Sequence, residues 1–114
     1  MSEHRFEQLV AEAIDDLPEW VHQHLENVDV VVEAAPPLGD PNLLGLYEGV
    51  PLTERGSDYG WTLPDRITLF RSTIVDESGA SEDDLKRVVA DTVVHEIAHF
   101  FGIGDERLHE LGRD

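Results

Sequence analysis

The chain has 114 residues, of which 40% are hydrophobic and 29% are charged, as is usual for one globular domain. Asp and Glu outnumber Lys and Arg by 25 to 8, and the formal charge of −17 repels phosphate backbones, which argues against a nucleic-acid partner. No apolar run is long enough to span a bilayer, so we expect a cytoplasmic protein with no membrane partner. Because no cysteine is present, imidazole and carboxylate groups must hold any metal.

The first elements are a helix, a helical turn and a strand. Apolar residues recur at spacings of three and four over residues 3–17 and predict a packing helix that stops before Pro18. A short helical turn is expected over residues 19–25. The β-branched run at 28–33 predicts a strand, and its continuous valines indicate burial on both faces.

The middle of the chain combines turns with two further candidate strands. A break rich in proline and glycine at 36–42 precedes a segment, 43–50, that is compatible with a strand. Residues 51–64 are expected to form an ordered surface loop. Residues 66–71 alternate apolar and polar side chains and predict a half-exposed strand.

The last part of the chain is expected to be helical. A long helix is predicted over residues 81–101, because Ser-Glu-Asp-Asp at its start is a capping box with Asp in place of Glu and the acidic first turn suits the helix dipole. Gly102 and Gly104 end this helix and permit a sharp turn. A short final helix is expected over 105–111.

The long helix carries two histidines that one metal ion can bind. His95 and His99 are four residues apart, so both imidazoles lie on one helix face. Zinc takes nitrogen ligands at about 2.0–2.1 Å, and a separation of one helical turn lets both rings reach it. Glu96 points about 100° around the helix, where it can accept a proton from metal-activated water without occupying a coordination site.

The residues after this pair extend the motif towards a third ligand. Gly102 stands where the helix must stop, and Asp105 follows His99 by six residues. A turn at the glycine can return the Asp105 carboxylate to the metal, although Asp105 is also a good N-cap for the final helix. His109 is the alternative third ligand.

The run from His95 to Asp105, His-Glu-x-x-His-x-x-Gly-x-x-Asp, resembles the zincin superfamily, and more closely the short bacterial zincin-like proteins described as minimal metalloproteases. Two further segments, 45–56 and 63–71, are similar to segments of that family, so the resemblance covers roughly residues 1–110. It implies a single α+β zincin-like domain over residues 1–114, with the active-site helix packed on a small mixed sheet.

The resemblance also implies roles for the motif residues. One zinc ion per chain would be held by His95, His99 and Asp105, with Glu96 as the catalytic base. The chain departs from the metzincin branch at two points, because aspartate stands in place of a third histidine and the only methionine is Met1, which excludes a methionine turn.

Together these features predict a zinc-dependent metallopeptidase in which Glu96 deprotonates a metal-activated water and then protonates the leaving amine. The strand expected at 66–71 would align an extended peptide by edge pairing, and the negative surface would favour a basic peptide or protein substrate. The oligomeric state does not follow from the sequence.

Three other functions remain open at this stage. A non-catalytic zinc-dependent binding or regulatory module would use the same metal pair in a chain too small for a deep cleft. A metal-dependent RNA hydrolase is opposed by the charge of −17. A purely structural site would need a closed four-ligand shell, for which His109 is the candidate fourth member.

Several other polar residues are of types that active sites use. His22 and His24 are two residues apart, which on a helix points them to different sides, and both are expected to be solvated. Tyr47, Tyr59 and Arg66 are able to stabilise an oxyanion, but none of them is assigned this role.

Overall fold

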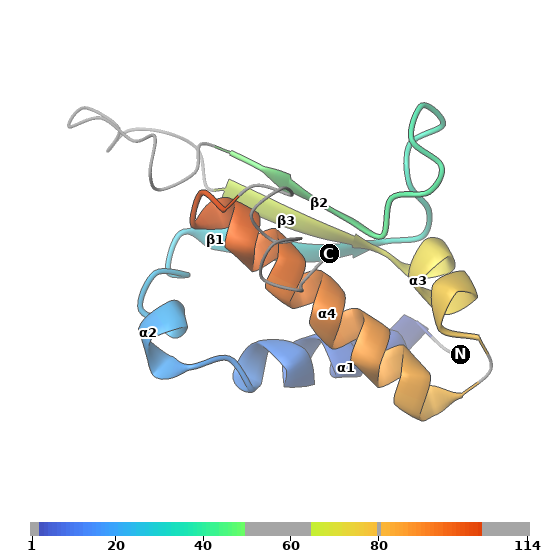
Figure 1. Ribbon diagram of the computed structural model, residues 1–114, viewed down its shortest axis with the longest axis horizontal. Helices are drawn as coiled ribbons and strands as arrows, with labels where there is room; N and C mark the ends of the chain where they lie inside the picture. The colour runs from blue at the N-terminus through green and yellow to red at the C-terminus, as the bar shows by residue number, and fades with distance from the viewer. Residues whose placement is uncertain (1–2, 50–64, 80, 104–114) are drawn as a thin grey trace.

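The structure, a computed structural model, describes residues 3–49, 65–79 and 81–103 (Figure 1). The expected loop at 51–64 and the expected final helix lie outside these residues, as do the site candidates Tyr59, Asp105 and His109.

The described residues form four helices and one mixed sheet, which confirms the predicted α+β class. None of these helices is long and apolar enough to cross a membrane. In chain order the elements are α1 (Glu3–Asp15), α2 (Glu19–His22), β1 (Val28–Glu33), β2 (Gly45–Glu48), β3 (Asp65–Phe70), α3 (Arg71–Ser78) and α4 (Glu82–Phe100).

The strand order is β1-β3-β2, with β1 parallel and β2 antiparallel to β3. The central strand is therefore β3, and the prediction that this segment is half-exposed and free to pair with a peptide is wrong. Every residue of β3 except Arg66 is buried. The alternating pattern was misleading because Thr68 and Phe70, on the sheet face opposite Ile67 and Leu69, are buried as well.

Strand β1 is less buried than predicted, whereas β3 is more buried. The valines of β1 are half-buried rather than buried on both faces. Among the described strands β1 pairs only with β3, so it lies at an edge of the sheet, where one side of the strand has no neighbouring strand to cover it.

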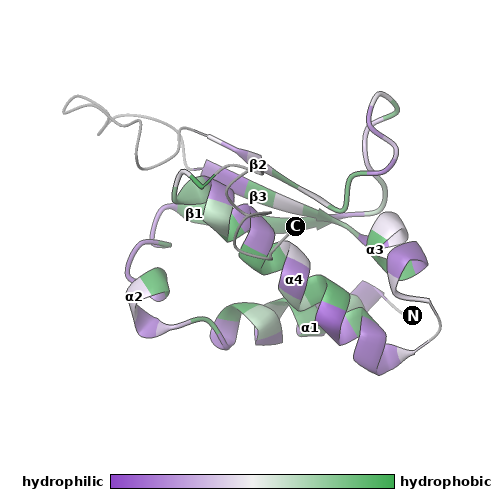
Figure 2. Ribbon diagram, viewed as in Figure 1, coloured by the Kyte–Doolittle hydropathy of each residue, from purple (hydrophilic) through white to green (hydrophobic). Residues whose placement is uncertain are grey.

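The hydrophobic core lies between the sheet and the two long helices. Figure 1 shows α4 crossing one face of the sheet with α1 beside it, and Figure 2 shows hydrophobic and hydrophilic bands alternating along α4. This is the pattern of a helix that buries one face. The most deeply buried apolar side chains come from α1, β3, α3 and α4: Phe6, Ile67, Leu69, Ile74, Val89 and Phe100.

One helix, α3, was not predicted. It begins at Arg71 directly after β3, without a side-chain cap. Its β-branched residues Thr73, Ile74 and Val75 disfavour a helix intrinsically. Tertiary contacts compensate, because Ile74 is fully buried and the Thr73 hydroxyl donates a hydrogen bond to the Leu43 carbonyl at 2.6 Å.

The termini of α4 confirm the predicted signals. At its start the Asp84 amide donates to Ser81 Oγ at 3.3 Å, which is the N-cap half of the expected capping box. At its end Gly102 adopts φ +87°, and the amides of Gly102 and Ile103 donate to the carbonyls of His99 and Ala98, both at 2.9 Å. This pair of bonds is a Schellman motif, which stops the helix immediately after the histidine pair.

Candidate metal centre

The predicted histidine pair lies in the last two turns of α4. His95 and His99 are both half-buried, and their ring centroids are 4.6 Å apart at an interplanar angle of 72°. The spacing of four residues therefore places the two imidazoles side by side while leaving part of each ring in contact with solvent. An ion and a substrate can both approach such a pair.

Glu96 lies between the two imidazoles along the chain but faces the sheet, and only 5% of the residue is exposed. Its Oε1 lies 3.3 Å from Nδ1 of His99. When Nδ1 carries the ring proton it donates to this carboxylate, and Nε2 then has a lone pair available for a metal. The contact therefore orients both groups at once.

Gly45 at the start of β2 makes this burial of Glu96 possible. A Cβ atom at Gly45 would lie 2.9 Å from Thr92 Cγ2, 3.2 Å from Glu96 Cγ and 3.2 Å from the Thr68 carbonyl oxygen. Only glycine lets β2 approach α4 so closely at the level of Glu96. This role of Gly45 was not predicted, although a glycine inside a strand is a signal of close backbone approach.

The donor set fits a zinc ion. One ligand atom from each of His95, Glu96 and His99 lies within 4.8 Å of the others. Two imidazoles and a carboxylate are a common set of zinc ligands. The structure therefore brings Glu96 together with the predicted ligands, while Asp105 lies outside the described residues.

The other site candidates within the described residues do not join this cluster. Tyr47 donates its hydroxyl proton to Asp65 Oδ2 at 2.7 Å, a carboxylate of β3. Arg66 is exposed and, by strand alternation, lies on the sheet face opposite Ile67. His24 is exposed as predicted, whereas His22 is half-buried.

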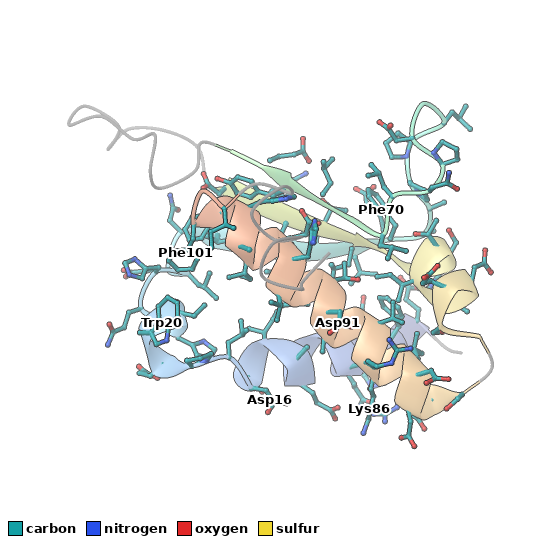
Figure 3. The ribbon with its side chains drawn as sticks, in the orientation of Figure 1. Asp16, Trp20, Phe70, Lys86, Asp91 and Phe101 are labelled. Atoms are coloured by element: carbon teal, nitrogen blue, oxygen red, sulfur yellow. The ribbon has the colours of Figure 1, made fainter. Side chains whose placement is uncertain are left out.

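The C-terminal end of α4 is held by aromatic contacts. Trp20 of α2 lies 5.5 Å from Phe101, centroid to centroid, and Figure 3 labels both rings at this end of the helix. His24 meets Phe101 edge-on at 5.4 Å, and Tyr47 lies 6.0 Å from Phe100. Such contacts restrain the helical turn that carries His99.

A cleft of about 400 Å³ opens beside the histidine pair. Its lining comes from the segment entering β2, from the end of α3 and from one face of α4 over residues 87–96, and it includes His95 and Glu96. This volume has room for several side-chain groups.

Comparison with known proteins gives a consistent result. A family model described as zincin-like metallopeptidase matches residues 25–113. A solved structure of a conserved hypothetical protein from Thermus thermophilus is similar to this chain at 26% sequence identity and a TM-score of 0.60, over 99% of this chain and 100% of that one. A search of curated proteins finds no match.

Proposed function

This chain belongs to the zincin-like metallopeptidase family, and on that premise we propose that it is a zinc-dependent metallopeptidase whose single domain spans residues 1–114. The observation that carries the proposal is the placing of a buried carboxylate, Glu96, against two partly exposed imidazoles beside a cleft. A metal site that reaches a cleft through His95 suits catalysis, because a catalytic zinc keeps one position for water or substrate.

His95 and His99 would hold the zinc ion, one per chain, with Asp105 as the third protein ligand on the strength of the sequence motif. Bound zinc supplies Lewis-acid polarisation of the scissile carbonyl and activates a water molecule. The helix presents its two imidazoles from adjacent turns, and the Schellman motif at Gly102 ends the helix directly after them, which is compatible with Asp105 as a ligand.

Glu96 would act as the general base and then as the general acid. Its carboxylate takes a proton from the attacking water and delivers that proton to the leaving nitrogen as the peptide bond breaks. The close approach of Gly45 to the Glu96 side chain and the contact of Glu96 Oε1 with His99 Nδ1 support this role, because a carboxylate held by its neighbours needs little reorganisation before proton transfer.

The substrate would lie along β2 rather than along β3. Among the described strands β2 pairs on one side only, with β3, so its other edge is able to accept an extended peptide. At Gly45 this strand approaches Glu96 closely, and both residues line the cleft. A peptide hydrogen-bonded to β2 would therefore pass close to the histidine pair.

A second candidate is a non-catalytic zinc-dependent binding or regulatory module. The burial of Glu96 and its place in the same cluster as both histidines favour it, because a buried carboxylate is also suited to be a metal ligand. In that arrangement Glu96 would complete the coordination shell instead of moving protons.

The variant Glu96→Gln separates these two functions. A general base replaced by an amide should keep zinc at about one per chain and lose hydrolysis of unstructured peptides by at least roughly 100-fold. Glu12→Gln, on the exposed side of α1, makes the same charge change and should leave zinc content and hydrolysis unaltered. Loss of zinc in Glu96→Gln, or intact peptides with the zinc-loaded wild type, would support the second candidate.

A cytoplasmic location is the remaining part of the proposal. It is supported by the lack of cysteine in the chain, since proteins of oxidising compartments commonly carry disulfides.

A further inference from the structure

The cleft beside the histidine pair extends along α4 towards its N-terminal half. Asp91, about halfway along the helix in Figure 3, lines the cleft together with His95 and Glu96. Asp91 precedes Glu96 by five positions, which corresponds to a rise of about 7.5 Å along the helix axis. This length is close to that of an extended lysine or arginine side chain.

The cleft has both apolar and charged lining residues. Leu43, Leu44 and Val88 contribute apolar surface, and Val88 is 6% exposed. Carboxylates lie at the rim, because Glu77 of α3 and Asp91 of α4 are both exposed. An apolar floor with a charged rim suits a side chain that has an aliphatic stem and a polar head.

The charge of the cleft is negative. Away from the proposed metal site its titratable lining comprises two carboxylates, Glu77 and Asp91, and one guanidinium, Arg87. The lining residues Glu96 and His95 belong to the metal site, where a bound divalent ion would offset the charge of Glu96. Arg87 is matched by two carboxylates of its own helix, with Asp84 Oδ1 at 3.8 Å and Asp91 Oδ2 at 3.9 Å. None of the ion pairs between described residues involves Glu77.

This balance favours a cation over an anion. An acidic substrate group would have to compete with Asp84 and Asp91 for an ion pair with Arg87. A basic substrate group could pair with Glu77 and, together with Arg87, with Asp91. The net charge of −17 on the whole chain acts in the same direction and draws basic peptides towards the protein.

We infer that this cleft is a specificity pocket for a lysine or arginine side chain close to the scissile bond, with the stem on Leu43, Leu44 and Val88 and the head at Glu77 and Asp91. The inference rests on the proposed function, since it assigns the substrate class of the same site. It assigns Glu77 and Asp91 a part in selecting the substrate and none in the bond-breaking step.

The test uses the zinc-loaded full chain and peptides that differ at one position. That position carries lysine, norleucine or glutamate and is moved through the residues flanking the scissile bond. Norleucine keeps the stem of lysine without its charge. At the best position kcat/KM should be roughly four- to 25-fold higher for lysine than for norleucine, because each of the two exposed carboxylates contributes a factor of about two to five. The glutamate peptide should be the poorest substrate.

The variants locate the effect within the cleft. In Glu77→Gln/Asp91→Asn the ratio of lysine to norleucine should fall to about one, and Asp91→Lys should shift the preference towards glutamate. Asp29→Asn, an exposed position on β1, makes the same charge change as Asp91→Asn and should keep the wild-type ratio. A ratio unchanged in the double variant, or reduced equally by Asp29→Asn, would overturn the inference.

A binding measurement separates this result from the proposed function. If the norleucine peptide is cleaved but lysine gives no advantage, the peptidase stands and the pocket assignment fails. If no peptide is cleaved, the peptidase proposal fails, and the affinities of the zinc-loaded wild-type chain for the lysine and norleucine peptides decide the pocket. Tighter binding of lysine that disappears in the double variant supports it, and equal binding refutes it.

Discussion

Replacing Gly45 by alanine measures how much the site depends on the close approach of β2 to Glu96. The new Cβ would lie 2.9 Å from Thr92 Cγ2 and 3.2 Å from both Glu96 Cγ and the Thr68 carbonyl oxygen. Ordinary van der Waals contacts between carbon atoms are about 3.5–4.0 Å, so neighbours on three sides must move by several tenths of an ångström. All three are backbone or buried side-chain atoms with little freedom to yield.

The expected loss of stability follows from two opposing effects. Overpacking of a well-packed site costs about 1–3 kcal/mol, while alanine restricts the unfolded chain and recovers about 0.4–1 kcal/mol. The free energy of unfolding should therefore fall by about 1–2 kcal/mol. For a domain of this size that corresponds to a decrease in Tm of roughly 4–12 °C.

The expected loss of activity is larger than the loss of stability suggests. A shift of Glu96 by several tenths of an ångström should lower kcat by about tenfold or more, because a misplacement of about 1 Å can cost 100-fold. Zinc content should change little, since neither imidazole is among the nearest neighbours of the added Cβ. The assays are denaturant unfolding, elemental analysis and steady-state hydrolysis of a peptide.

Two variants make this prediction specific. Gly39→Ala adds the same methyl group where nothing lies within 4 Å and should keep wild-type stability and kcat. Thr92→Ser removes the methyl group at 2.9 Å and should restore part of the stability of Gly45→Ala, a coupling that a double-mutant cycle measures. A Gly45→Ala protein with wild-type kcat and Tm would refute the reasoning.

Three further predictions concern the metal and the end of α4. Chelation of zinc should lower Tm, because the metal binds only the folded arrangement of the two histidines; an apo protein as heat-stable as the loaded one would contradict this. Asp105→Ala should lose most of its zinc affinity and His109→Ala should keep it, as measured by parallel zinc titrations; the reverse result would make the histidine the third ligand. Gly102→Ala should cost about 1–2 kcal/mol in urea unfolding because φ at this position is +87°, and unchanged stability would contradict the Schellman assignment.

The sequence by itself determines the elements whose signals are local. The helices α1 and α4 could be predicted because their apolar residues repeat at the helical period and because Ser81, Pro18 and Gly102 mark their ends. The histidine pair could be predicted for the same reason, since residues four apart on one helix share a face whatever else the chain does. The family resemblance begins with that local motif and extends to the segments 45–56 and 63–71.

Tertiary structure decides what depends on neighbours distant in sequence. The central place of β3 comes from pairing with β1 and β2, and no pattern within β3 reports how many partners a strand has. Helix α3 forms against its own propensities because burial of Ile74 outweighs them. The burial of Glu96 under Gly45 and the negative cleft beside it arise where three elements meet, and their geometry is set by packing between segments that the chain's order keeps far apart.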